Sequence, residues 1–335
     1  MKIAIHIPQK LPFSIQNYID NILKQLDNSV RIYKFCSFTD AEKINKKIDI
    51  FWFPYCAGGS TPFLRFLKIL KNKKFVITLH GVAPFSLSLR NCYSSLKAAL
   101  KGEILKYTFF IKWQIYKQLA NKIITVSNFS KYELINKLKI PSNKIYPIYH
   151  GVDTDLFRPN NKKEFKNDKF FLHISQYQPK KNVDRIIEAY KKLSNPKPKF
   201  ILIVSGYQKT VNDDNIILIK KAKKTTELVE LYQKALVFTF PSLHEAFGMP
   251  ILEAMACGCP VITSNITGCA EIAGDAALLV NPYSTDEISN AMRKIMENPK
   301  LREDLSKKGL ERVKQFTWEK SAKEHLKVFE MVLKE

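Results

Sequence analysis

The amino-acid sequence predicts an α/β protein with two doubly wound, Rossmann-like domains whose parallel sheets face an interdomain cleft. Short apolar runs alternate with helix-like segments along the chain, which is the pattern of parallel sheets covered by helices on both faces. A polar segment rich in Asn and Lys, Arg158 to Lys169, interrupts this alternation near the middle and is typical of a linker. Domains of this class bind ligands at the carboxyl ends of their strands.

The expected strands are the apolar runs themselves. They are KIAIHI, IDIFWFPY, KFVITLHG, KIITVS and KIYPIYHGV in the first half, then KFFLHIS, KFILIVSGY, NIILIK, ALVFTFPS, PVITS and AALLV in the second. The final segment, FTWEKSAKEHLKVFEMVL, is amphipathic and indicates a helix. We therefore expect an N-terminal domain at 1–157, a linker at 158–169, a C-terminal domain at 170–318, and a helix at 319–335 that packs back across the junction.

The totals exclude several classes of protein. With 335 residues, 45% hydrophobic and 25% charged, the chain can bury the cores of two domains. No run approaches the roughly 18 uncharged apolar residues that a membrane span requires, and the first apolar run is too short for a signal peptide. The six cysteines lack the paired spacing of a zinc site and the density of a disulfide scaffold. We expect a cytoplasmic protein.

Positive charge is concentrated in the first half of the chain. Residues 1–160 contain 25 Lys and Arg against 9 Asp and Glu, a balance of +16, whereas the remaining residues contain 29 against 22, a balance of +7. The first half is therefore the part expected to meet an anionic partner. Basic and large apolar residues are mixed in two segments, Phe63 to Phe75 and Leu105 to Lys122.

The second of these segments, read as a helix, suits a peripheral position on the acidic inner face of the plasma membrane. The alternative is a core helix whose lysines face water, and the sequence leaves both open. Because no nucleic-acid-binding motif is present, we expect no nucleic-acid partner.

An anion site is predicted within HEAFGMPILEAMACGCPVITS. Pro250 suits the first turn of a helix and Gly258 the position past its end, which predicts two helical turns over Pro250 to Cys257. The start of a helix presents unpaired N–H groups that suit a phosphate. Glu245 precedes this helix and Glu253 lies near its first turn. Since carboxylates do not bind phosphate, sugar hydroxyls are their expected partners.

A second anion site is predicted within HISQYQPKKNVDRIIEAY. Lys180 and Lys181 come directly before a segment of helical periodicity that follows a strand, and Asn182 is placed to cap that helix. A lysine pair is more often solvated surface charge. Two sites between strand and helix in one domain nevertheless favour a diphosphate ligand.

The stretch PSLHEAFGMPILEAMACGCPVITS resembles glycosyltransferase family 4, also called glycosyl transferases group 1, the retaining nucleotide-sugar transferases of the GT-B fold. It contains the two glutamates of that family's signature, separated by seven residues, as Glu245 and Glu253. The resemblance covers about residues 76–325 and is weaker before them. Further matching motifs are TLHG, VSNFSK, YHGVDTDLFRP, QPKKN, EIAGDAALLVNP and FTWEKSA.

The resemblance implies a role for each matching residue. Glu253 would accept hydrogen bonds from the donor ribose, Glu245 would hold a sugar hydroxyl, and Lys181 would neutralise the departing diphosphate. His80 would contact the sugar near its anomeric carbon. The implied catalytic residues are Glu245, His80 and Lys181. The implied donor-binding residues are Glu253, Lys180, Phe247, Gly248, Met249, Pro250, Gln176 and Leu252. No metal or other cofactor is expected, because lysines and helix dipoles would supply the positive charge.

Two departures from the family pattern stand out. Many members have Gly-Arg where this chain has Ser175 and Gln176, and Lys180 is expected to replace the missing cation. The loop after the first strand, IPQKLPFSIQNY, contains no glycine, although the family's loop is glycine-rich. This second departure concerns the acceptor side.

The sequence therefore predicts a metal-independent hexosyltransferase that retains configuration and uses a nucleotide-diphosphate sugar, GDP-mannose in particular. Its expected acceptor is a glycan or a lipid-linked glycan, in synthesis of cell-surface polysaccharide or of the lipopolysaccharide type. A non-catalytic protein that binds sugar nucleotides or glycans, and a nucleotide-sugar epimerase, remain alternatives. A glycosidase, which would also use two carboxylates, leaves the phosphate sites unexplained.

Overall fold

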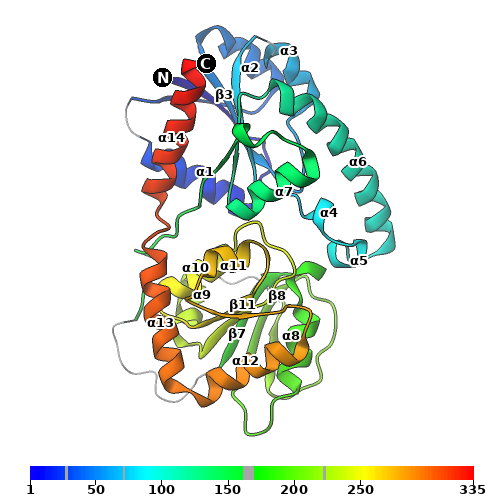
Figure 1. Ribbon diagram of the computed structural model, residues 1–335, viewed down its shortest axis with the longest axis vertical. Coiled ribbons are helices and arrows are strands. Elements are labelled where there is room, and N and C mark those ends of the chain that lie inside the picture. The colour runs from blue at the N-terminus through cyan, green and yellow to red at the C-terminus, as the bar shows by residue number, and fades with distance from the viewer. Residues whose placement is uncertain (27–28, 71, 161–169, 222–223) are drawn as a thin grey trace. The chain divides into compact units, whose positions relative to one another are not determined.

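The computed structural model describes the chain except residues 27–28, 71, 161–169 and 222–223 (Figure 1). It divides into two compact units. The first comprises residues 1–89, 95–151 and 318–335, and the second comprises 90–94 and 152–317. Each unit contains a six-stranded parallel sheet, so the predicted α/β class is confirmed. Most of the expected linker, residues 161–169, lies outside the described residues.

The first sheet has the strand order β2-β1-β3-β4-β5-β6. Its strands are β1 Lys2–His6, β2 Arg31–Phe35, β3 Ile50–Cys56, β4 Lys74–Leu79, β5 Lys122–Thr125 and β6 Ile145–Pro147. Strand β2 was not predicted from the sequence. It lies at the edge of the sheet and only Phe35 of its five residues is buried, so its side chains do not form the apolar run of a central strand.

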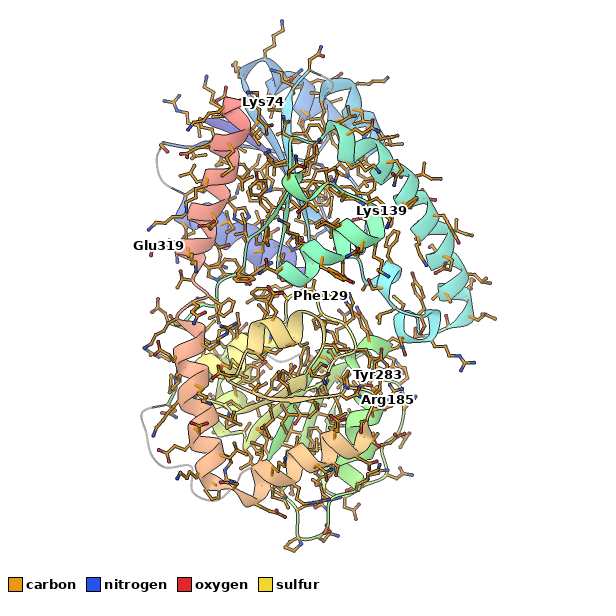
Figure 2. The ribbon with its side chains drawn as sticks, in the orientation of Figure 1. Lys74, Phe129, Lys139, Arg185, Tyr283 and Glu319 are labelled. Carbon is orange, nitrogen blue, oxygen red and sulfur yellow. The ribbon has the colours of Figure 1, made fainter. Side chains whose placement is uncertain are left out.

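Helices cover this sheet on both faces (Figure 1). In the first unit they are α1 Phe13–Gln25, α2 Phe38–Ile44, α3 Leu67–Leu70, α4 Ala83–Ser86, α6 Leu96–Leu119, α7 Asn128–Leu138 and α14 Trp318–Lys334. The C-terminal helix α14 packs on α1 and on strands β3, β4 and β5. Lys74, at the start of β4, donates to the carbonyl of Leu333 at 2.7 Å, which attaches the end of α14 to the sheet (Figure 2).

The predicted bounds of one segment are wrong. The helix expected within Leu105 to Lys122 begins earlier, at Leu96, and Lys122 already belongs to β5. The Ser95 hydroxyl accepts a hydrogen bond from the Ala98 N–H at 3.2 Å and so caps the start of α6.

The second sheet has the order β12-β11-β10-β7-β8-β9. Its strands are β7 Phe171–Gln176, β8 Phe200–Ser205, β9 Ile216–Ile219, β10 Val237–Phe240, β11 Val261–Ser264 and β12 Leu278–Val280. The chain builds outward from β7 to β9 and then returns to the other side of β7 with β10. The carboxyl ends of β7 and β10 therefore form a topological switch point, where ligands of such sheets bind.

The second unit also contains helices. They are α8 Val183–Lys191, α9 Thr225–Lys234, α10 Met249–Ala256, α11 Thr267–Ala273, α12 Thr285–Glu297 and α13 Pro299–Val313. The short helix α5, Leu89–Cys92, lies where the chain passes between the two groups of residues.

Candidate functional site

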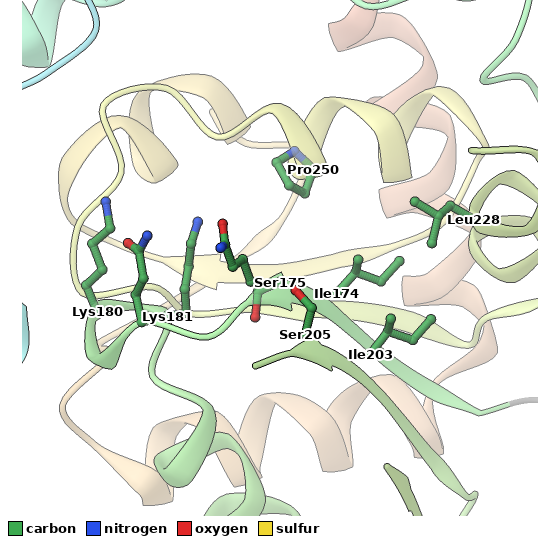
Figure 3. Close-up of a pocket in the computed structure, with 10 residues that line it drawn as sticks. Ile174, Ser175, Lys180, Lys181, Ile203, Ser205, Leu228 and Pro250 are labelled. Carbon is green, nitrogen blue, oxygen red and sulfur yellow. The ribbon is translucent and has the colours of Figure 1, made fainter. Parts of the chain in front are cut away.

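A pocket of about 380 Å³ opens at the carboxyl ends of β7 and β8 (Figure 3). Lys180 and Lys181 stand at one end of it, while Ile203 and Leu228 lie toward the other. The pocket thus pairs a cationic end with an apolar end, which suits a ligand that is anionic at one end and has a flat apolar group at the other. The remaining lining residues are Ile174, Ser175, Gln176, Gln178, Ser205 and Pro250.

The two lysines lie on a single 3₁₀ turn, Pro179–Lys181, between β7 and α8. Asn182 follows in a left-handed conformation with φ 64°, but its predicted capping role is wrong. Its side-chain amide instead donates to the carbonyls of Pro241, at 2.9 Å, and Pro282, at 2.6 Å. The left-handed backbone directs this side chain toward the loops after β10 and β12, which fixes the lysine turn against both.

Lys181 forms a buried ion pair with Glu245. Its Nζ lies 2.6 Å from the Glu245 Oε1, and the two side chains are 16% and 12% exposed. Burial alone would raise the pKa of Glu245, but the charges of Lys181 and Lys180 outweigh it and hold that pKa below its ordinary value. Glu245 is therefore an anion at neutral pH, next to the cationic end of the pocket.

The loop that holds Glu245 is fixed by close backbone packing. The N–H of Gly268, at the start of α11, donates to the Glu245 carbonyl at 2.9 Å. A Cβ at Gly268 would lie 2.7 Å from the Ala246 carbonyl group, so only glycine fits there. On the other side, the Leu243 N–H donates to the Lys180 carbonyl at 2.7 Å. Gly268 was not among the predicted site residues, although an isolated glycine in a helical pattern can have a packing reason.

Helix α10 begins at Met249, one residue before the predicted start, and ends at Ala256. Gly248 precedes it with φ 113° and Gly258 follows it with φ 74°, so glycines are required at both ends. Phe247 is buried against Phe316, with ring centroids 6.1 Å apart. Leu252 is fully buried and offers no side-chain surface to a ligand.

Glu253 lies one turn into α10, in a different environment. The Tyr232 hydroxyl, from α9, donates to its Oε2 at 3.3 Å. Within the described part of the chain Glu253 has no ion pair, and burial raises the pKa of its carboxyl to about 7. Neither Glu253 nor Tyr232 lines the pocket itself, and Tyr232 was not among the predicted site residues.

Ser175 and Gln176 end β7 at the mouth of the pocket. Gln176 is exposed there, whereas the Ser175 hydroxyl lies 2.8 Å from the Nε2 of His173. The His173 Nδ1 donates to the Thr239 carbonyl at 2.8 Å, and burial lowers the pKa of this imidazole to about 4. His173 is therefore neutral, and its Nε2 accepts a hydrogen bond from the Ser175 hydroxyl. Four lining residues were not predicted from the sequence, because they reach the pocket from separate segments: Gln178, Ile203, Ser205 and Leu228.

His80 belongs to the first unit, where it follows β4. Its Nε2 donates to the Pro54 carbonyl at 2.7 Å, and the rings of Tyr18 and His150 lie 4.9 and 5.6 Å from its own. Burial lowers the pKa of His80 to about 4, which keeps the imidazole neutral. The structure thus brings Glu245, Lys180 and Lys181 together in one unit and places His80 in the other.

The described residues contain neither a candidate metal site nor a candidate membrane-spanning helix. No three His, Cys, Asp or Glu side chains among them come close enough to hold a metal ion. Across the same residues, no helix combines the length and the apolar character needed to cross a bilayer.

The family comparisons cover both halves of the chain. Residues 19–156 match Glycosyltransferase Family 4, and residues 156–312 match Glycosyl transferases group 1. An O-antigen chain mannosyltransferase B from Escherichia coli is 30% identical over 233 residues, which are 64% of this chain and 61% of that protein. An uncharacterized glycosyltransferase from Methanocaldococcus jannaschii is 31% identical over 78% of this chain and 70% of its own length. The chain thus spans about three fifths of the E. coli relative.

Solved structures show the same fold at low sequence identity. A glycosyltransferase from Rickettsia africae superposes with a TM-score of 0.72 at 18% identity, covering 99% of this chain and 98% of its own. The Anabaena protein HepE in complex with UDP-glucose gives a TM-score of 0.71 at 17% identity, covering 98% and 100%. The two matched families, the relative that is 31% identical and the paired parallel sheets lead to one conclusion: this chain belongs to glycosyltransferase family 4, with the GT-B fold.

Proposed function

We propose that this protein transfers a hexose, with retention of configuration and without a metal, from a nucleotide-diphosphate sugar to a glycan or lipid-linked acceptor. The bond between the anomeric carbon and the diphosphate oxygen breaks, and a bond from that carbon to an acceptor oxygen forms on the same face of the sugar. The acceptor hydroxyl gives its proton to the departing diphosphate oxygen, and the nucleoside diphosphate leaves.

The observation that carries this proposal is the buried Lys181–Glu245 pair at the cationic end of a polarised pocket. A nucleoside diphosphate matches that pocket, with its base toward Ile203 and Leu228 and its phosphates toward Lys180 and Lys181. The sugar beyond the phosphates then meets Glu245.

The ion pair also indicates how the site responds to its donor. Without donor, Lys181 is paired with Glu245 at 2.6 Å. A bound diphosphate competes with Glu245 for the Lys181 ammonium group. The attraction between diphosphate and ammonium group grows as negative charge develops on the leaving oxygen. Glu245 is then released to accept a hydrogen bond from a sugar hydroxyl, which orients the sugar as the bond breaks.

The other proposed donor contacts rest on the family resemblance. Glu253 accepts hydrogen bonds from the ribose, as the family resemblance implies, and Gln176 with Lys180 covers the diphosphate from the β7 side. Backbone groups of Phe247, Gly248 and Met249 reach the sugar, while Pro250 borders the pocket. His80, kept neutral by burial and with its Nε2 donating to the Pro54 carbonyl, accepts a hydrogen bond through Nδ1 near the anomeric carbon without adding positive charge.

We propose mannose from GDP-mannose as the donor, and cytoplasmic synthesis of cell-surface polysaccharide or lipopolysaccharide-type glycan as the setting. The E. coli relative is named as an O-antigen chain mannosyltransferase, and a Salmonella typhimurium relative, 28% identical, is named likewise. UDP-glucose, which is bound in the Anabaena structure, is the donor to test against it.

A panel of nucleotide sugars, read first by thermal shift and then by turnover, tests the proposal. A donor at 100 times its dissociation constant stabilises the folded protein by about 2.7 kcal/mol, so the true donor should raise the melting temperature most. With that donor we expect release of nucleoside diphosphate and a product of retained configuration, at the same rate in EDTA. Binding without transfer or hydrolysis would support a non-catalytic binding protein instead, and an altered sugar in the unreacted donor would support an epimerase.

A further inference from the structure

Helix α6 has two apolar faces, of which the body of the first unit covers only one. Two hydrogen bonds hold the covered face in place. The Trp113 indole donates to the Gly59 carbonyl at 2.7 Å, and the Tyr116 hydroxyl donates to the Pro62 carbonyl at 3.1 Å. Both side chains are fully buried. The rotation of α6 about its axis is therefore fixed.

The opposite face of α6 is an exposed apolar stripe. Its members follow one another at intervals of three or four residues, which places them in one line along a helix. Ile104, Tyr107 and Ile111 are 68%, 66% and 64% exposed, and Figure 2 shows side chains projecting from the outer side of α6. The stripe consists of Leu96, Leu100, Ile104, Tyr107, Ile111 and Ile115.

The part of the chain that contains the stripe is strongly basic. Between Ile50 and Tyr132 the sequence contains 13 Lys and Arg and a single acidic residue, Glu103. Glu103 is itself paired with Lys106 at 3.2 Å. Lys97 and Lys101 lie on the exposed side of the helix. An apolar stripe bordered by lysines is the pattern of a helix that lies in the interface of an anionic bilayer.

We propose that α6 docks this protein on anionic membranes, with the apolar stripe at the boundary between headgroups and acyl chains and the lysines on acidic headgroups. Charge complementarity selects this occupant. A second copy of the chain would bring one basic face against another, and a nucleic acid would leave the apolar side chains in water. The docking adds a membrane-binding surface to the function proposed above. It explains how the protein reaches a lipid-linked acceptor.

The decisive test separates apolar insertion from attraction between charges. Full-length protein is floated with phosphatidylcholine vesicles that contain or lack phosphatidylserine, at low and high salt. We expect the variant Leu100→Gln/Ile104→Gln/Ile111→Gln to lose about tenfold or more in affinity for the acidic vesicles, because three immersed side chains become polar. Because salt does not screen the apolar contribution, the residual binding of wild type at high salt should disappear in this variant.

Two further variants complete the design. Lys97→Gln/Lys101→Gln/Lys112→Gln should lose the salt-dependent part of binding; Lys106 is kept because it pairs with Glu103. The control Ile217→Gln/Leu279→Gln alters residues 40% and 41% exposed on strands of the second unit, and should bind like wild type.

Circular dichroism and donor thermal shift should be unchanged in every variant, so that failure of docking is distinguishable from failure of the proposed function. Vesicle binding of the α6 apolar variant equal to that of wild type would overturn the proposal. So would a stable dimer that this variant dissociates, together with no vesicle binding by wild type.

Discussion

The two signature glutamates, eight positions apart, lie in opposite electrostatic environments. Glu245, in the loop before α10, is paired with Lys181 and its pKa is lowered. Glu253, inside α10, accepts a hydrogen bond from the Tyr232 hydroxyl, and burial raises its pKa to about 7. The pairing keeps Glu245 ionised at neutral pH, whereas Glu253 changes charge near neutral pH. The same residue type can therefore serve two tasks in one motif.

The largest expected effect comes from breaking the pair. Lys181→Ala leaves a buried carboxylate without its paired ammonium group, which should cost about 3–5 kcal/mol of unfolding free energy. The turnover number should fall more than the donor KM rises, since leaving-group charge is greatest in the transition state. Chemical denaturation and steady-state kinetics measure the two effects.

The double variant Lys181→Met/Glu245→Gln serves as the control, because it removes both charges at similar volume. It should regain most of the lost stability but none of the turnover. Wild-type turnover in this variant would remove the ion pair from the mechanism.

Glu253→Ala should next weaken binding of the donor and of free nucleoside diphosphate by about 1.5–3 kcal/mol, because the ribose loses a charged acceptor. Calorimetric titration measures both ligands. Tyr232→Phe removes the neighbouring hydroxyl but keeps the carboxylate, and should bind within a few-fold of wild type. Unchanged affinity for the diphosphate in Glu253→Ala would rule out the ribose role.

Gly268→Ala should displace the loop that holds Glu245 and leave the surroundings of Glu253 unchanged. The added methyl would meet backbone atoms at 2.7 Å, and such overpacking costs about 1–3 kcal/mol. Turnover should fall with stability, while affinity for free nucleoside diphosphate stays close to wild type. Gly309→Ala is the matched control, since its methyl would meet the Met255 side chain at 3.1 Å, which can shift. Equal damage from both substitutions would contradict this account.

The smallest expected effect is a dependence on pH that Glu253 alone creates. With a pKa of about 7, Glu253 is mostly protonated at pH 6, so donor affinity should fall about tenfold from pH 8 to pH 6. Glu253→Gln should be flat over this range. If the donor affinity of wild type is equally independent of pH, the Glu253 carboxyl is not protonated in this range.

The stability of the ligand-free protein should fall as the pH rises, whereas its affinity for the donor should increase. The folded-state pKa of Glu253 is raised above its ordinary value of 4.5, so its contribution is fully present below pH 4.5 and is lost as pH rises through about 7. The difference in melting temperature between wild type and Glu253→Gln should therefore change over this window, which a thermal denaturation series can measure.

Much of the fold could be predicted because the evidence for it is local. Central strands buried on both faces read as apolar runs, and glycines with positive φ mark both ends of α10. The edge strand β2, with one buried residue, offers no such signal. Both lysines and both glutamates could also be named from short motifs.

Their pairing could not be predicted in the same way. Lys181 and Glu245 are 64 residues apart in the chain, and their contact depends on β7 and β10 lying side by side. Likewise, the fit of Gly268 against the Glu245 loop depends on the position of α11, which no local pattern specifies.

Helix α6 marks the same division. The sequence by itself determined that this segment is helical, basic and apolar, because composition and periodicity are local properties. Only the tertiary structure decided which apolar face is buried. The carbonyls of Gly59 and Pro62 accept hydrogen bonds from Trp113 and Tyr116, so the opposite face of the helix is exposed to solvent. The charge states of the two glutamates were decided in the same way, since burial and neighbouring charges, which set a pKa, come from residues distant in sequence.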